Sequence, residues 1–162
     1  MRKYLAFLAL PVCFLSAEAR GLLSEAELEA MRLDVSSYPQ VGSVSLVNLD
    51  LNRQGTVLIA YPGEKVRATV NISCEDKEID PHTLYQVIVG YEDGGPQKCI
   101  LNEFGYRLGD AIRFFFLEAP SEPGEYNIQF RLEETPSPLE AMQNWGRESS
   151  LQMTIGKIIV VE

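Results

Sequence analysis

Hydrophobic and polar side chains alternate with a period of two along most of the chain after residue 43. The runs 65–74 and 125–133 show it most regularly, as expected of strands that bury one face. The run 84–91 is apolar at nearly every position, which is typical of a strand inside a sheet and covered on both faces. The pattern predicts strands at 43–51, 56–61, 65–74, 84–91, 99–101, 111–117, 125–133 and 151–161. Gly156 would shift the last strand like a bulge.

Two short segments carry the signals of helix starts instead. Ser24 followed by Glu27 forms a capping-box pattern that predicts a helix to about residue 33. Ser137, Pro138 and Glu140 predict a second short helix that ends near residue 145. Both helices lie outside the alternating region, so we expect them at its periphery.

Short strands separated by turn signals about every 10 residues predict an all-β fold, a two-sheet antiparallel sandwich with two short peripheral helices. The expected organisation is a signal peptide at 1–19, a helix and linker at 20–42, and the sandwich at 43–162.

Two turns within the sandwich region resemble those of immunoglobulin-like domains. Pro62-Gly63-Glu64 precedes one alternating strand and Pro123-Gly124-Glu125-Tyr126 opens another, like the second and sixth strands of that fold. The resemblance spans about 43–162 and implies an immunoglobulin-like sandwich, with Tyr126 at the tyrosine-corner position. The chain departs from the antibody type, since Trp145 lies in a late connection and Cys99 falls between the third and fifth strands. The resemblance therefore implies neither the family disulfide nor an antibody-like role.

The N-terminus has the three parts of a secretory signal. A basic start, Met1-Arg2-Lys3, precedes the apolar run 4–15 and the small residues of Ser16-Ala17-Glu18-Ala19. We expect cleavage after Ala19 and a secreted or periplasmic protein. Lipid anchoring through Cys13 is an alternative, although the residues before it are not the small ones that lipoprotein processing uses. No later run approaches the length of a membrane span, so we expect no transmembrane segment in the processed chain.

The composition argues against one class of partner, nucleic acid. The chain has 162 residues, with 14 Lys and Arg against 23 Asp and Glu, a net charge of −9, and 46% hydrophobic residues. These values are typical of a globular domain. The acidic balance argues against nucleic acid as a partner, because phosphate binding needs clustered cations.

Two cysteines lie beyond the signal region, Cys74 and Cys99. An even count in an exported chain predicts a Cys74–Cys99 disulfide. Two thiols or a metal pair are the alternatives, but with His82 as the only imidazole a tetrahedral zinc site is not expected.

Catalytic motifs with recognisable spacing are absent from the sequence, and we predict no enzyme activity and no cofactor. His82 follows Asp80-Pro81 and is interpreted as a loop residue. The acidic stretch 75–80 is interpreted as a solvated loop; a calcium site is the alternative, although the order of an EF-hand is missing.

Three consecutive phenylalanines, Phe114, Phe115 and Phe116, lie on one predicted strand. Alternation sends Phe115 to one face and its two neighbours to the other. Either both faces are covered, one by the core and one by a helix, or the uncovered face forms an apolar patch for a partner. The 139–145 helix could supply that cover, or it could present Trp145 to a ligand. Phe115 and Trp145 are thus the candidate ligand contacts.

These features favour an exported, non-catalytic binding or structural module that acts in the cell envelope or extracellular space on a protein or carbohydrate partner. One alternative is a small exported hydrolase with an unidentified carboxylate site. The other is a subunit of an envelope assembly that docks through the helix at Ser24 or through the final strand as an uncovered edge.

Overall fold

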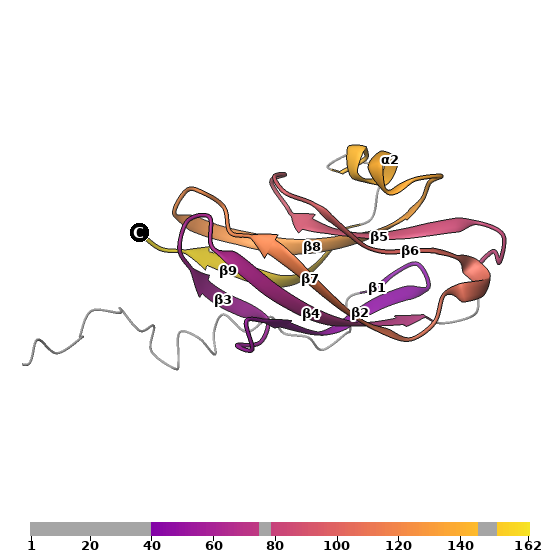
Figure 1. Cartoon of the computed structure of the whole chain (residues 1–162), viewed down its shortest axis with the longest axis horizontal. Coiled ribbons are helices and arrows are strands. Elements are labelled where there is room, and N and C mark those ends of the chain that lie inside the picture. Colours follow the sequence, from indigo (N-terminus) through magenta and orange to yellow (C-terminus); the bar gives the residue numbers. More distant parts are fainter. Residues whose placement is uncertain (1–39, 75–78, 146–151) are drawn as a thin grey trace, which may run out of the picture. The chain divides into compact units, whose positions relative to one another are not determined.

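Two β-sheets make up the part of the chain that the structure, a computed structural model, describes: residues 40–74, 79–145 and 152–162 (Figure 1). The first sheet has the order β1 (Gln40–Val41), β2 (Val44–Leu51), β4 (Lys65–Cys74), β7 (Ala111–Glu118). The second sheet has the order β3 (Val57–Ala60), β9 (Met153–Val160), β8 (Gly124–Glu134), β5 (Leu84–Tyr91), β6 (Lys98–Phe104). The predicted all-β, two-sheet fold is confirmed.

The alternating side chains form the core between the sheets. In β4, Val66, Ala68, Val70 and Ile72 are all buried, while the residues between them are exposed or half-buried. Ile128 and Phe130 of β8 and Val87 and Val89 of β5 meet them from the second sheet, and these too are buried. One face of each strand thus supplies the apolar area whose removal from water stabilises the sandwich.

Three features of the pairing differ from the expectation. β3 pairs with β9 in parallel, so the sandwich is not wholly antiparallel. This parallel pair arises because the chain leaves the first sheet after β2 and continues in the second as β3, through a turn in which Asn52, Arg53 and Gly55 have positive φ. The short strand β1 was not predicted. The last strand, β9, lies between β3 and β8 and is therefore not an open edge, which corrects the docking role considered for it.

One short helix, α2 (Pro138–Gln143), lies among the described residues, and it begins as predicted. Its first turn is capped by the Ser137 hydroxyl, which accepts a hydrogen bond from the Glu140 backbone N–H at 3.3 Å, and Pro138 occupies the first turn. The helix packs on β5 and β6 of the second sheet (Figure 1). The predicted signal peptide, Cys13, and the helix at 24–33 lie outside the described residues. Within the described ranges, none of the helices has the length and apolar character needed to cross a bilayer.

The predicted irregularity at Gly156 is confirmed. Ile128 pairs with Gly156, but the next residue, Gln129, pairs with Thr154, so β9 contains one extra residue at this point. A Cβ built on Gly156 would lie 2.5 Å from Leu49 Cδ2 and 2.7 Å from the Thr56 carbonyl oxygen. The position therefore leaves room only for glycine, because Leu49 of β2 and the backbone at Thr56 lie directly against it.

We predict that Gly156→Ala destabilises the protein by about 1–3 kcal/mol, the usual cost of forcing an extra carbon into a packed site. Gly109→Ala is the matched control, because nothing lies within 4 Å of a Cβ at that position, and we expect a change within about 0.5 kcal/mol. Urea unfolding of both variants measures the difference. Equal stabilities would contradict the close approach at Gly156.

Candidate binding surface

Strand β7 divides its apolar residues between the two faces of the first sheet. Phe115 and Leu117 point into the core and are only 5% and 3% exposed. Ile112, Phe114 and Phe116 alternate with them and are 58%, 65% and 52% exposed. We call these three the apolar stripe. Strand geometry requires this arrangement, because successive side chains point to opposite faces.

The stripe lies on an edge strand. β4 pairs along one side of β7, from Lys65 opposite Glu118 to Ile72 opposite Ala111. The described residues place no strand on the other side of β7. This side therefore combines large exposed apolar side chains with a backbone edge that has no strand partner in the described chain, the two features that favour pairing with an added strand.

Two cations of β4 lie over the phenylalanine rings of the stripe. Lys65 Nζ is 4.3 Å from the centre of the Phe116 ring, and the Arg67 guanidinium carbon is 5.5 Å from the centre of the Phe114 ring. The ion pairs of the described residues involve Arg131 and Lys157, not these two cations. Lys65 and Arg67 thus hold positive charge above the stripe, each through a cation–π contact.

The two residues predicted as ligand contacts, Phe115 and Trp145, both pack against other parts of the sandwich. Phe115 is buried in the core, so the alternative in which its neighbours form the exposed patch is the one that the structure matches. Trp145 packs against the outer face of the second sheet, where its ring nitrogen donates a hydrogen bond to the Tyr91 carbonyl at 2.9 Å. A Cβ on Gly90 would lie 3.0 Å from the indole. Trp145 is therefore a packing residue that closes the second sheet.

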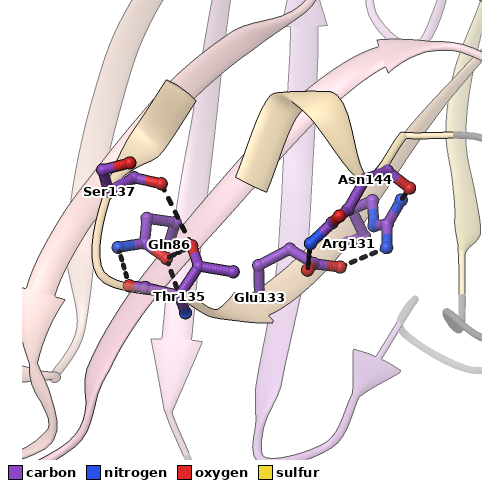
Figure 2. Close-up of polar contacts among 6 residues, drawn as sticks. All are labelled: Gln86, Arg131, Glu133, Thr135, Ser137 and Asn144. Carbon is purple, nitrogen blue, oxygen red and sulfur yellow. Dashed lines mark hydrogen bonds and ion pairs between the residues drawn. The ribbon is translucent and has the colours of Figure 1, made fainter. Parts of the chain in front are cut away.

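A buried polar network supports this closure (Figure 2). Arg131 of β8, only 1% exposed, pairs with the Glu133 carboxylate and donates to the Asn144 carbonyl. The Asn144 side-chain amide also donates to Glu133, at 3.2 Å. The guanidinium of Arg131 further lies 5.9 Å from the centre of the Trp145 ring. These contacts hold the end of α2 against β8.

A second polar group joins the start of the α2 segment to β5. The amide of Gln86, which is fully buried, donates to the Thr135 carbonyl at 2.7 Å and accepts from the Thr135 backbone N–H at 3.2 Å (Figure 2). It also donates to Asn102 of β6 at 3.1 Å. Because buried polar groups must be paired, these bonds determine where the chain leaves β8 and crosses to the helix.

The predicted Cys74–Cys99 disulfide is absent from the described structure, which corrects that prediction. Cys74 ends β4 of the first sheet, whereas Cys99 lies in β6 at the edge of the second. β4 lies inside its own sheet and does not neighbour β6, and facing sheets are about 10 Å apart, while disulfides require Cα atoms within about 7 Å. The Cys99 thiol donates to the Leu101 carbonyl at 3.1 Å, and burial raises the pKa of this thiol.

Two cavities open at the ends of the sandwich. One, of about 340 Å³, lies beside Tyr91, Tyr126 and Glu118. The Tyr91 hydroxyl donates to the Glu118 carbonyl at 3.0 Å, and burial, assisted by the charges of Asp93 and Glu118, raises the pKa of Tyr91. Its phenol therefore stays protonated and hydrogen-bonded at neutral pH.

The second cavity, of about 440 Å³, lies beside His82, Thr83 and Glu134. The Asp80 carboxylate accepts bonds from the His82 backbone N–H at 3.0 Å and the Thr83 hydroxyl at 2.7 Å, and these bonds lower the pKa of Asp80. Asp80 thus closes a turn, and the Thr83 hydroxyl is engaged there. Residues 75–78 of the acidic stretch lie outside the described residues, and no group of three or more His, Cys, Asp or Glu among the described residues could hold a metal ion.

No protein-family model matches the chain, and no curated protein shows significant similarity to it.

Sequence reasoning singled out the phenylalanines but missed Ile112, Lys65 and Arg67. The signal for Ile112 was its spacing, since it stands two residues before Phe114 and four before Phe116. The signal for the cations could not be read along the chain, because it depends on the register between β4 and β7.

We predict that a reductant leaves the unfolding midpoint of the native protein unchanged. A disulfide closing the loop from Cys74 to Cys99 would contribute about 3.5 kcal/mol, and its reduction would remove that contribution. Urea unfolding with and without dithiothreitol measures the effect. A loss of unfolding free energy of that size on reduction would reinstate the prediction of a Cys74–Cys99 disulfide.

We predict that Trp145→Ala lowers the free energy of unfolding by about 2 kcal/mol or more, because it removes a packed indole and leaves the Tyr91 carbonyl without its donor. Leu139→Ala serves as the control, since Leu139 is exposed on the neighbouring helix. Its expected effect is within about 0.5 kcal/mol. Thermal and urea unfolding compare the two variants, and an unchanged stability of Trp145→Ala would favour a ligand role for the indole.

Proposed function

We propose that this chain is an exported, non-catalytic binding module of the cell envelope or extracellular space, and that it holds a protein partner at the apolar stripe. The single observation that carries the proposal is the exposure of Ile112, Phe114 and Phe116 along one edge strand. Contiguous exposed apolar side chains of this kind are typical of interaction sites. The signal-like N-terminus of the sequence supports the exported location.

The strand order supports an immunoglobulin-like sandwich for this module. In immunoglobulin domains the first, second and fifth strands share one sheet, and the third, sixth and seventh share the other. Here β2, β4 and β7 share the first sheet, and β5, β8 and β9 share the second. The Tyr126 hydroxyl donates to the Glu122 carbonyl at 3.0 Å, four residues upstream, as in a tyrosine corner.

The same resemblance supports the position proposed for the partner. In the constant-type domain a fourth strand pairs with the fifth. In the described part of this chain, β6 belongs instead to the other sheet, and the connection after it leads through a 3-10 turn, Gly105–Arg107, straight into β7. The side of β7 that a fourth strand would cover is thus the side that we propose for the partner.

A non-catalytic role is supported by how the candidate chemical groups are used. The Thr83 hydroxyl and the Asp80 carboxylate bond to each other, and the Tyr91 hydroxyl bonds to a backbone carbonyl. A carbohydrate role for Trp145 has less support than a protein partner, because the indole ring lies against Gly90 and Arg131 and its N–H is bonded to the Tyr91 carbonyl.

A photo-crosslinking residue placed at position 114 of the full chain tests this proposal in the cells that produce it. We predict a discrete adduct in the envelope or extracellular fraction, and its loss when Phe116→Ser removes part of the stripe. Position 139 is the control, because Leu139 is equally exposed but lies on α2.

The same adducts from positions 114 and 139, or none from either, would contradict a binding role for the stripe. Circular dichroism of Phe116→Ser checks that it folds, and we expect that it does, because an exposed side chain contributes little to the core.

A further inference from the structure

We propose that the partner is an extended segment of another protein, which pairs along β7 as an added strand and directs carboxylates toward Lys65 and Arg67. This inference rests on the proposed function and specifies its ligand. It follows from three properties of the site: the backbone edge, the spacing of the stripe, and the position of the two cations.

The backbone edge favours a strand over other apolar ligands. The outer side of β7 has no strand partner within the described ranges, and a polypeptide in extended conformation can satisfy its backbone groups through a β-ladder. Lipid acyl chains cover apolar side chains but cannot form these hydrogen bonds. The net charge of −9 also opposes approach of the whole molecule to an anionic bilayer.

The spacing of the stripe fits the repeat of a strand. Ile112, Phe114 and Phe116 are two residues apart, so their side chains recur about every 6.8 Å on one face. Side chains of an added strand recur at the same interval, and those facing outward lie opposite the stripe. Those facing inward meet Phe115 and Leu117 at the rim of the core.

The cations supply charge complementarity. An added strand would lie about 4.8 Å from β7 and twice that distance from β4. Lys65 and Arg67 belong to β4, but their charged ends reach over the rings of Phe116 and Phe114, toward the edge. Carboxylates on the outer face of the segment can therefore reach them across the stripe.

The acidic groups of the chain itself limit where those carboxylates can lie. Asp110 precedes β7 and Glu118 ends it, so the strand is bounded by negative charge at both ends. The Asp110 carboxylate is also bonded to the Ser73 hydroxyl at 2.9 Å. In the register Lys65 lies directly opposite Glu118 and Arg67 opposite Phe116, while their charged ends lie over the rings of Phe116 and Phe114. At physiological salt charges are screened within about 8 Å, so Arg67 sets the preference toward the middle of the strand, and Lys65 shares the end of the strand with the Glu118 carboxylate.

A second copy of this chain fits less well. Pairing of β7 with another β7 would bring together apolar residues, but it would add a second set of the same cations and no carboxylate in the middle of the strand. Charge complementarity therefore favours an acidic segment over self-association.

Four fluorescent ten-residue peptides test the inference with the purified full chain, and each alternates valine with a second residue. In three of the peptides the second residue at the central positions is Glu, Gln or Lys. The fourth peptide is the Glu peptide with two prolines at its centre. We expect the Glu peptide to bind about tenfold tighter than the Lys peptide, from two exposed ion pairs. We expect no binding of the proline peptide, because proline cannot continue a ladder.

Charge reversal provides the decisive comparison. In the K65E/R67E variant we expect the order to invert, with the Lys peptide binding tightest, while K98E leaves the order unchanged. Lys98 is the matched control because it is an exposed cation on β6, the edge strand of the other sheet. Fluorescence anisotropy at low and high salt measures each affinity, and we expect high salt to reduce the difference between the Glu and Lys peptides.

Several outcomes would overturn the inference. If the proline peptide binds as tightly as the Glu peptide, strand pairing is excluded. If the order of peptide affinities is unchanged in K65E/R67E, the two cations are excluded as the groups that contact the acidic segment. A dimer by light scattering that F114S/F116S abolishes would assign the stripe to a second copy. Binding to phosphatidylglycerol vesicles that depends on Phe114 would assign it to a membrane surface. If no peptide binds while the crosslink at position 114 persists, the inference fails and the binding role of the stripe stands.

Discussion

A β-strand cannot bury two consecutive side chains on the same face, and this constraint governs both the core and the surface of the first sheet. Phe115 fills part of the core between β4 and the second sheet, so Phe114 and Phe116 must point outward from the same strand. Turning the strand over would expose Phe115 and Leu117 and bury the charged end of the strand at Glu118. The exposed rings thus follow from the requirement to fill the core. On the outer face they remain in contact with water unless another segment or a partner covers them.

The second sheet meets the same constraint differently. β5 is buried on both faces, and its outer face is covered by α2 and Trp145. Gly90 makes room for the indole, and the buried Arg131 and Gln86, together with the half-buried Glu133, place the covering segment through hydrogen bonds (Figure 2). Breaking such a buried network by removing one partner is costly, so this cover is built to stay closed. The first sheet has no comparable cover in the described chain, and this asymmetry between the sheets is what supports the proposal of a binding surface at β7.

Much of the fold could be predicted from the alternation alone, whereas the site could be predicted only in part. Regular runs such as 65–74 identify strands because burial of one face imposes a period of two. The cap at Ser137 and the bulge at Gly156 were also predictable, since each depends on residues close in sequence. Strand pairing was not. Which sheet holds Cys99, and which face α2 covers, depend on contacts between distant segments. The disulfide was therefore reasonable from the sequence and does not match the structure, and the packing of Trp145 against β5 could not be read along the chain.

The positions of Lys65 and Arg67 oppose pairing of the exposed apolar edge with a second copy of itself. Charged side chains beside an edge strand discourage association between identical edges, because each copy meets the same charge. The same two cations attract a segment of opposite charge, so one arrangement excludes the wrong partner and favours the right one. Each of the two rings, Phe114 and Phe116, is stabilised by a cation–π contact with one of the cations. These contacts also hold the two positive charges beside the edge strand. Selectivity at β7 then comes from β4, the neighbouring strand, and not from the residues that supply the apolar contact.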